Sequence, residues 1–298
     1  MLAPLFQLLP QLAPARSGGP EPVGLLACAG RFPIVFAEKA RECGVPVVCV
    51  GVAGMADPLL RSICAEYHTL RRASLGFLIR TFRRAGVRRW TMAGKFHKHL
   101  LYRPWRLLQL LPDWRMARFY FFRRRKANND DSILLGLIAE FRAAGLECVS
   151  ALNLCPELLV RQGVLTRRKP TPAEERDIAI GWELAKEMGR LDVGQSVMVR
   201  ERAVLAVEAI EGTDRAILRA GELSGRTGFV VVKVAKPGQD MRFDVPTVGR
   251  QTIESMRAAG AGVLAVEAGK TILLDEAETI ALADRYGIAI TALPQRGG

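Results

Sequence analysis

The sequence of 298 residues has no hydrophobic run long enough to cross a bilayer. Its longest uncharged run, residues 1–15, contains three prolines, whereas a transmembrane helix needs about 20 apolar residues. This excludes an integral membrane protein that crosses by helices. Ala13-Pro14-Ala15 looks like a small-residue cleavage site, but no basic region precedes the apolar stretch. We therefore expect residues 1–21 to be a disordered extension rather than a signal peptide.

Several common chemical signatures are also absent. None of the six cysteines forms a C-x-x-C pair, so we expect reduced, mostly buried thiols of a cytosolic protein and no zinc site. The three histidines make no triad with an obvious serine or cysteine, and there is no serine-hydrolase elbow or Walker loop. A full G-x-G-x-x-G fingerprint is missing, which argues against a nucleotide-dependent oxidoreductase.

What remains is an ordinary globular composition, with 49% hydrophobic and 24% charged residues. Short apolar runs alternate with helical patterns in both halves, which is typical of parallel sheets covered by helices. We predict two α/β domains with a cleft between them: a Rossmann-like parallel sheet at residues 22–160 and a mixed α/β domain at residues 172–298. The charged, Pro-ended stretch 161–171 is the expected linker. Strands are predicted at residues 24–29, 46–52, 87–92, 146–152, 197–200, 203–208, 229–235, 263–267, 271–274 and 288–293. The strands at 197–200 and 203–208 are expected to form a hairpin around Glu201-Arg202.

Helix starts in the second half carry clear capping signals. Thr171, Pro172 and Glu174 predict a capping box. Thr247 is predicted to cap a helix that ends at residue 259, and Asp275 with Glu278 to cap the helix that follows.

Positive charge is concentrated in one segment, residues 71–126. This segment holds 17 Lys and Arg against one acid, so it carries +16, and the rest of the chain carries −3 of the total of +13. Aromatic residues interleave with the cations, including three of the four tryptophans. Such a segment can bind single-stranded nucleic acid, lie on an anionic membrane, or form the solvated face of ordinary helices. Leucine pairs beside Trp105 favour the membrane surface.

Two turns in the first half are candidate phosphate sites, because each follows a predicted strand. Exposed backbone N–H groups at Ala29-Gly30 and a helix N-terminus favour an anion there. Exposed backbone N–H groups at Gly94-Lys95 favour an anion in the same way, and Lys95 adds a positive charge. The alternatives are a plain tight turn at the first position and a surface loop at the second.

Lys233 interrupts an apolar run, Val230-Val231-Val232-Lys233-Val234. If this run is buried, the lysine needs an anionic partner. The alternative is an edge strand with Lys233 pointing to solvent.

The loop after this run gathers charges, and its Asp244 lies between two prolines. Lys236, Asp240, Arg242 and Asp244 lie within nine residues. A rigid carboxylate beside cations suits Mg²⁺, which takes one or two carboxylates plus substrate phosphates. Alternatively, Asp244 helps to cap the helix that Thr247 begins.

A second carboxylate cluster surrounds Gly212-Thr213, with Glu208, Glu211 and Asp214. It can supply a metal ligand, while the backbone amides contact a phosphate. The alternative is that the acids stabilise the first turn of a helix.

Four ordered motifs resemble the UDP-2,3-diacylglucosamine pyrophosphatase family, of the metal-dependent, two-domain type. They read GRLDVGQ, LAVEAIEGTD, KPGQDMRFDVPTVG and EAGK, at residues 189–195, 205–214, 236–249 and 267–270. The resemblance covers residues 22–298 and is weaker before residue 165. Two features depart from the family pattern. Cys28 and Ala29 stand where the family has consecutive glycines, and residues 95–126 are unusually basic and aromatic.

The resemblance implies hydrolysis of the pyrophosphate of UDP-2,3-diacylglucosamine to UMP and 2,3-diacylglucosamine 1-phosphate, a step of lipid A synthesis. It also implies Mg²⁺, with Mn²⁺ as the alternative ion, water attack on the sugar-side phosphorus, and an essential aspartate at Asp244. With the residue patterns, it predicts Asp244, Arg242 and Lys236 as catalytic and Asp244, Asp240 and Asp214 as metal ligands. The predicted substrate-binding residues are Ala29, Gly30, Gly94, Lys95, Gln195, Gly212, Thr213, Lys233 and Thr247.

The expected location is the cytoplasmic face of the inner membrane, with residues 71–126 on the anionic surface and no nucleic-acid partner. An oligomer is left open. The rival interpretation is a non-enzymatic membrane- or nucleic-acid-binding module, which leaves residues 236–249 unexplained.

Overall fold

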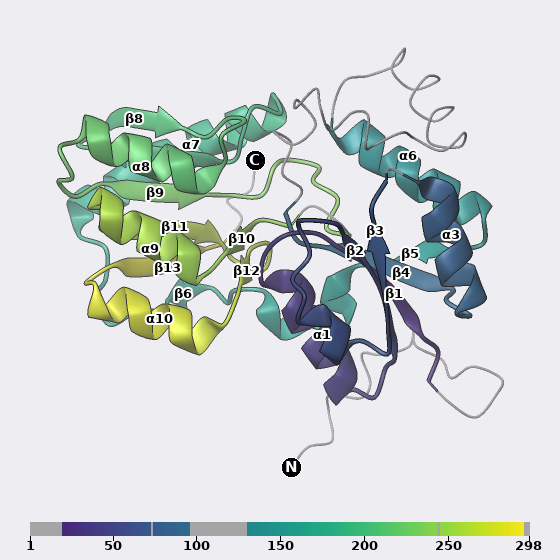
Figure 1. Ribbon diagram of the computed structural model, residues 1–298. Coiled ribbons are helices and arrows are strands. Elements are labelled where there is room, and N and C mark those ends of the chain that lie inside the picture. The colour runs from purple at the N-terminus through teal and green to yellow at the C-terminus, as the bar shows by residue number, and fades with distance from the viewer. Residues whose placement is uncertain (1–19, 73, 96–129, 243–244, 295–298) are drawn as a thin grey trace. The chain divides into compact units, whose positions relative to one another are not determined.

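The computed structural model describes residues 20–72, 74–95, 130–242 and 245–294 (Figure 1). The chain divides into two compact units between Cys155 and Pro156, and both are α/β, as predicted. The expected linker, residues 161–171, belongs to the second unit, because β6 (Gly163–Val164) pairs antiparallel with β13 (Ala289–Leu293). Residues 73 and 96–126 of the basic segment, and residues 1–19 of the expected extension, lie outside the described residues.

The first unit contains a parallel five-stranded sheet with the strand order β3-β2-β1-β4-β5. This order places a topological switch point between β1 and β4, where α/β proteins bind ligands at the carboxyl ends of the strands. The Rossmann-like prediction for this half is therefore confirmed. The strands are β1 (Val23–Ala27), β2 (Val47–Val52), β3 (Glu66–Leu70), β4 (Arg89–Ala93) and β5 (Glu147–Cys148).

Helices cover both faces of this sheet (Figure 1). The face that carries Trp90 packs against α3 (Leu75–Arg84) and α6 (Asp130–Ala143), through a ring cluster of Phe82, Trp90 and Phe141. Gly24 makes room for this cluster, because a Cβ there would lie 2.9 Å from the Cβ of Trp90. Two helices from the connections on either side of β2, α1 (Phe32–Glu42) and α2 (Leu60–Ile63), pack against each other.

The predicted strand at residues 146–152 is shorter than expected. Only β5 pairs with β4, and a 3-10 turn at Ala151–Asn153 follows, because the Ser150 side chain accepts a hydrogen bond from the Leu152 amide. The strand β3 and the helices α2 and α3 were not predicted from the sequence. All six cysteines lie in the described residues and form no disulfide, and four of them are buried.

The second unit contains a mixed six-stranded sheet with the order β6-β13-β11-β9-β7-β8. Its centre is parallel, because β9 (Val230–Lys233), β11 (Val263–Glu267) and β13 run in the same direction. Its far edge is an antiparallel hairpin of β7 (Ser196–Arg200) and β8 (Ala203–Val207). A separate parallel pair is formed by β10 (Thr247–Val248) and β12 (Ile272–Leu273).

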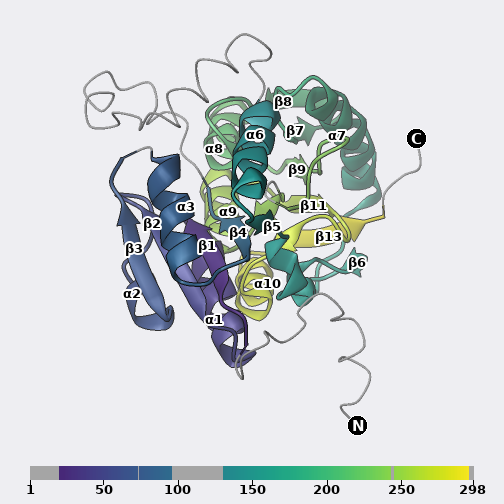
Figure 2. The same cartoon turned by 90° about the vertical axis from the view of Figure 1, so that its right-hand side faces the viewer.

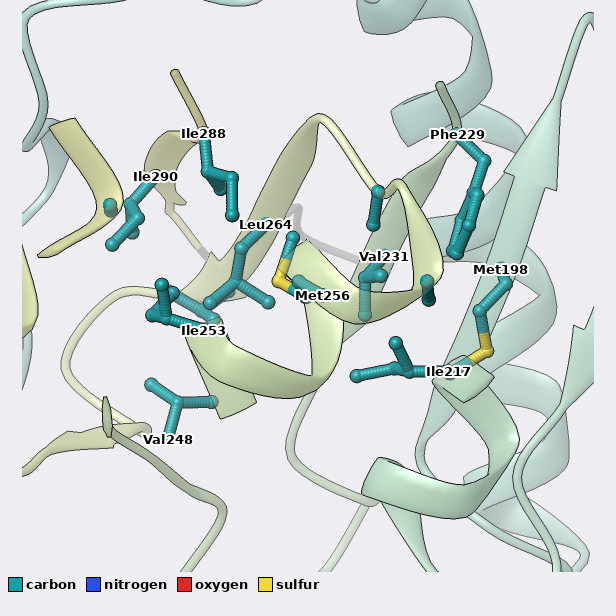
Figure 3. Close-up of a cluster of buried hydrophobic side chains, with 14 of the residues drawn as sticks. Met198, Ile217, Phe229, Val231, Val248, Ile253, Met256, Leu264, Ile288 and Ile290 are labelled. Atoms are coloured by element: carbon teal, nitrogen blue, oxygen red, sulfur yellow. The ribbon is translucent and has the colours of Figure 1, made fainter. Parts of the chain in front are cut away.

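Helices cover both faces of this sheet (Figure 2), and each face has its own hydrophobic core. The long helix α7 (Pro172–Arg190) covers one face with Ile178, Trp182 and Ala185. Figure 3 shows the other face, where Ile217, Ile253 and Met256 pack against Met198, Val231 and Leu264 of the strands. The helices on this face are α8 (Thr213–Leu223), α9 (Arg250–Ala259) and α10 (Glu276–Arg285).

The capping box that begins α7 is confirmed. Thr171 accepts a hydrogen bond from the Glu174 amide, and Glu174 accepts one from the Thr171 amide. The predicted hairpin turn is confirmed as well, since Glu201 and Arg202 have φ values of 49° and 68°. The Asp177 carboxylate of α7 accepts hydrogen bonds from both of their amides.

Of the other two predicted helix starts, the one at Thr247 was wrong, and the one at Asp275 is confirmed in position but not in its capping hydrogen bond. Thr247 does not cap a helix, because Thr247 and Val248 pair with β12 and α9 begins at Arg250 after Gly249. Asp275 precedes α10 with a left-handed backbone, φ 46°, and its side chain makes no capping hydrogen bond. At Thr247, pairing with a strand distant in sequence overrides the local capping signal.

Candidate functional site

Lys233 is the last residue of β9 and only 3% exposed. The strand lies between β11 and β7 in the middle of the sheet, so the edge-strand alternative was wrong. Its Nζ donates hydrogen bonds to Thr213 Oγ1 at 3.1 Å and to the Thr247 carbonyl at 3.0 Å. The structure thus brings together three residues that were predicted to bind substrate.

Thr213 links Lys233 to a buried carboxylate, that of Glu208. Its hydroxyl accepts from Lys233 and donates to Glu208 Oε1 at 3.0 Å, and Ser196 Oγ lies 3.5 Å away. Glu208 is 8% exposed, and within the described chain its second oxygen, Oε2, has no hydrogen-bond partner. A buried carboxylate oxygen without a partner is costly, so this cluster is poised to accept a proton donor or a cation.

The backbone around this cluster is tightly packed. Gly212 adopts φ 83° at the N-terminus of α8, and Asp214 lies in the first turn of that helix. A Cβ at position 194 would lie 2.0 Å from the Glu208 carbonyl oxygen, so only glycine fits there. The next residue, Gln195, accepts a hydrogen bond from the Val234 amide through its carbonyl. Its side-chain Oε1 is buried and lacks a hydrogen-bond partner within the residues that the structure describes.

The charged loop after β9 is held at its start by a buried ion pair. Glu267, the last residue of β11, is fully buried, and its Oε2 accepts from the Ala235 amide at 2.9 Å and from Lys186 Nζ at 2.7 Å. Lys186 also donates to the Ala235 carbonyl at 3.0 Å. Sequence reasoning missed this pair as a functional element. The available signal was an acid at the end of the apolar run Val263-Leu264-Ala265-Val266-Glu267.

The predicted cations of this loop each pair with a carboxylate. Lys236 contacts Asp192, and Arg242 contacts both oxygens of Asp240. The hydrogen bonds from the Arg242 side chain lower the pKa of Asp240 below its ordinary value. Asp244, the predicted catalytic aspartate, lies outside the described residues.

In the first unit the two predicted phosphate turns lie side by side. Ala29 and Lys95 exchange backbone hydrogen bonds of 3.1 and 2.7 Å. Gly30 and Gly94 have φ values of 101° and 96°, and a Cβ on Gly94 would lie 2.6 Å from the Ala29 carbonyl oxygen. The turns thus meet at the carboxyl ends of β1 and β4, at the switch point. Burial raises the pKa of the neighbouring Cys28 thiol to about 11, so it stays protonated and is a poor nucleophile.

The predicted metal ligands are all carboxylates, and the described ones do not form a metal site by themselves. Among residues 20–72, 74–95, 130–242 and 245–294, no three His, Cys, Asp or Glu side chains are grouped to hold a metal ion. Of the predicted ligands, Asp214 and Asp240 are described, and Asp240 already accepts from Arg242 with both oxygens. Glu208, whose Oε2 is buried and has no hydrogen-bond partner within the described chain, contacts Thr213, the residue that precedes Asp214. Hard cations such as Mg²⁺ take oxygen ligands of this kind.

No helix in the described part of the chain has the length and apolar character needed to cross a membrane.

Comparisons with known proteins agree over the length of the chain. The family model of the LpxI N-terminal domain matches residues 22–158, and that of the LpxI C-terminal domain matches residues 161–291. The chain is 31% identical over 278 residues to the UDP-2,3-diacylglucosamine pyrophosphatase LpxI of Caulobacter vibrioides, covering 90% of this chain and 96% of that protein. A solved structure titled "Crystal structure of gox2253" covers 91% of this chain and 77% of its own at 13% identity, but its TM-score of 0.29 is too low to support any inference. The two family models and the Caulobacter relative show that the chain belongs to the LpxI family.

Proposed function

We propose that the chain hydrolyses the pyrophosphate bond of UDP-2,3-diacylglucosamine, giving UMP and 2,3-diacylglucosamine 1-phosphate in lipid A biosynthesis. The observation that carries this proposal is the similarity to the Caulobacter pyrophosphatase over nearly its whole length. The buried charge cluster of the second unit supports it, since phosphoryl transfer depends mainly on positioning and on the neutralisation of oxygen charge.

In this proposal, three cations of the second unit act on the phosphoryl oxygens. Lys233 holds a buried positive charge at the start of the loop, and Lys236 and Arg242 follow it. Lys236 and Arg242 now pair with Asp192 and Asp240, and we propose that pyrophosphate oxygens replace these carboxylates when substrate binds. Water attacks the sugar-side phosphorus, the bond from this phosphorus to the bridging oxygen breaks, and UMP leaves with that oxygen.

We further propose that Mg²⁺, or Mn²⁺ in its place, is held by Asp244 with Asp240 or Asp214. Bound there, the ion would supply charge neutralisation on the pyrophosphate and a more acidic water. For Asp240 to serve, Arg242 must first release it, which fits the transfer of Arg242 to the substrate described above. The proposed backbone and amide contacts to the rest of the substrate are Gln195, Gly212 and the turns at Ala29-Gly30 and Gly94-Lys95.

The test of this function is UMP release from the purified lipid nucleotide. We expect release with Mg²⁺ or Mn²⁺, loss of release with EDTA, and recovery when the metal is restored. Asp244→Ala and Asp244→Asn should lower kcat by about a hundredfold or more, with the circular dichroism spectrum unchanged. Glu222→Gln, an exposed acid of α8, is the matched control and should retain full turnover. Turnover of the Asp244 variants at the level of the starting protein would contradict the assignment.

We also propose that residues 71–126 bind an anionic membrane surface, which places the enzyme on the cytoplasmic face of the inner membrane. The support is the +16 charge of this segment, interleaved with aromatic residues. Neutralising Arg123, Arg124, Arg125 and Lys126 to glutamine should reduce sedimentation with vesicles that contain anionic lipid. The control neutralises four exposed arginines of the second unit, namely Arg176, Arg202, Arg215 and Arg226. Equal sedimentation of the two variants would contradict the proposal, and preferential binding of the segment to single-stranded nucleic acid would favour the rival interpretation.

A further inference from the structure

Two cysteines of the first unit, 15 residues apart in the chain, lie in contact. Cys49 belongs to β2 and is fully buried, whereas Cys64 ends α2 and is partly exposed. The register of the sheet places Cys49 opposite Tyr67 of β3, three residues after Cys64. The Cys49 thiol donates a hydrogen bond to the Cys64 sulfur. Two sulfur atoms in such contact need only small side-chain rotations to bond to each other.

The contact makes the two thiols chemically unequal. The hydrogen bond from Cys49 lowers the pKa of the Cys64 thiol, although burial opposes this. The same hydrogen bond, together with burial, raises the pKa of the Cys49 thiol, so that Cys49 stays protonated at neutral pH. Because the thiolate is the nucleophile, Cys64 is the more reactive member, and its partial exposure lets a small oxidant reach it. Redox-sensitive pairs combine an accessible thiol of low pKa with a second thiol that resolves its oxidised form.

A bond between these cysteines would close a loop that lines a pocket. The pocket has a volume of about 750 Å³, and most of its lining residues lie between Cys49 and Cys64 in the chain. They are residues 52–58, which end β2 and follow it, and Arg61 of α2. Joining the ends of a loop reduces the number of conformations that the loop can adopt. Oxidation of the pair should therefore stiffen this wall of the pocket.

We propose that Cys49 and Cys64 form a reversible, redox-sensitive disulfide, with a peroxide as the oxidant. The Cys64 thiolate attacks one oxygen of hydrogen peroxide, the O–O bond breaks, and the hydroxide that leaves takes up a proton to form water. Cys64 is then a sulfenic acid. The Cys49 sulfur attacks the Cys64 sulfur, the S–O bond breaks, and a second water leaves with the Cys49 proton. The two thiols lose two electrons in all, peroxide is reduced to two waters, and a dithiol reductant reverses the change by thiol–disulfide exchange.

The test treats the folded, full-length chain with a small molar excess of hydrogen peroxide and then counts thiols in guanidinium chloride. The count should fall from six to four, and a dithiol reductant should return it to six. Tryptic digestion without reductant should give residues 42–61 linked to residues 62–71. Because the first peptide also contains Cys43, which is exposed, the matched control is Cys43→Ser. In this control the link and the loss of two thiols should persist.

Substitution of either member should abolish the link. In Cys49→Ala, which places no new polar group in the core, Cys64 should stop at the sulfenic acid and be trapped by dimedone. In Cys64→Ser, the buried Cys49 should not react with peroxide. Thermal unfolding of the reduced variants checks that each is folded.

Two results would overturn the inference: retention of all six thiols by the starting protein, or a link that disappears in Cys43→Ser. Hydrogen exchange of residues 52–61 tests the effect on the pocket wall, where the amides should exchange more slowly after oxidation, and exchange at the same rate would contradict the stiffening. None of these measurements uses hydrolysis of the lipid nucleotide, so the proposed function and this inference stand or fall separately.

Discussion

Lys186 holds the buried carboxylate of Glu267 and, with it, the first residue of the loop that carries Lys236, Asp240 and Arg242. Replacing Lys186 with methionine leaves Glu267 charged, buried and short of a donor. We expect a loss of roughly 1–3 kcal/mol in the free energy of unfolding, measured by urea titration. We also expect kcat to fall more than KM changes, because the loop start loses its anchor to α7. Lys186→Arg should restore both.

The control for this prediction lies on the same helix. Arg190 pairs with Glu187 at 2.9 Å, but both side chains are more than half exposed, at 61% and 64%. Exposed pairs of this kind contribute at most about 1 kcal/mol, so Arg190→Met should change stability and kcat little. Equal effects of the two substitutions would show that burial of the pair, and its contact with Ala235, do not matter.

Glu174 shows how a capping residue couples stability to pH. Burial opposes its charged form, but hydrogen bonds from Thr171 and Arg168 outweigh burial and lower the pKa of its carboxyl. A carboxyl with a lowered folded-state pKa stabilises the protein above its unfolded pKa, about 4.3 for Glu, and loses that effect as the pH falls through the folded value. The stability advantage over Glu174→Gln should be full at neutral pH and shrink below pH about 4. Urea unfolding of both proteins across this range tests it, and a pH-independent difference would contradict it.

At the scale of elements, α8 and α9 approach each other closely at Gly221. A Cβ there would lie 2.6 Å from the Ala259 carbonyl oxygen and 2.7 Å from its Cα. Because both neighbouring atoms are backbone, Gly221→Ala must push the helices apart, which costs about 1–3 kcal/mol despite the better helix propensity of alanine. Thermal or urea unfolding measures this loss. Gly228→Ala is the control, because no atom lies within 4 Å of a Cβ at that position. Equal stability of the two variants would contradict the close approach.

Local patterns predicted the elements that depend on local contacts. The capping box at Thr171 and Glu174 and the hairpin turn at Glu201-Arg202 involve residues close in sequence, and both are confirmed. The helix cap predicted at Thr247 was wrong for the opposite reason, since the backbone of Thr247 pairs with Ile272, 25 residues away. The strand β3 escaped prediction because its Glu66-Tyr67-His68-Thr69-Leu70 sequence lacks the apolar run of the strands buried in the sheet.

The residues of the candidate site likewise divide into those that a local sequence pattern predicts and those that only the fold brings together. Lys233 was predicted because a charge inside a valine run is visible in the sequence, and the structure shows it buried with Thr213 and Thr247. The contact of the Arg61 guanidinium with the Tyr67 ring, at 5.3 Å from the ring centroid, was not predicted, because it depends on the pairing of β3 with β2. Glu267 and Lys186 are 81 residues apart, and only the packing of α7 on the sheet brings them together.

For the molecule as a whole, the distribution of charge separates the two tasks proposed above, membrane binding and hydrolysis. The chain outside residues 71–126 carries −3, while that segment carries +16. Attraction to an anionic surface therefore depends on one segment, whereas the charges around Lys233 and Glu208 are buried or paired. Salt screens exposed charges strongly and buried charges much less. Membrane association and chemistry should therefore respond differently to ionic strength.

The last prediction follows from this difference. Raising the ionic strength from about 0.05 M to about 0.5 M shortens the Debye length severalfold, to a few ångströms. Hydrolysis of the lipid nucleotide in vesicles of anionic lipid should therefore slow, as the protein leaves the surface. With the same substrate in neutral detergent micelles, the rate should change much less, because the buried charges near the phosphates are little screened. UMP release measures both rates, and vesicle sedimentation follows the bound fraction. An equal salt dependence in vesicles and micelles would place the effect in the catalytic site and argue against an electrostatic membrane contact.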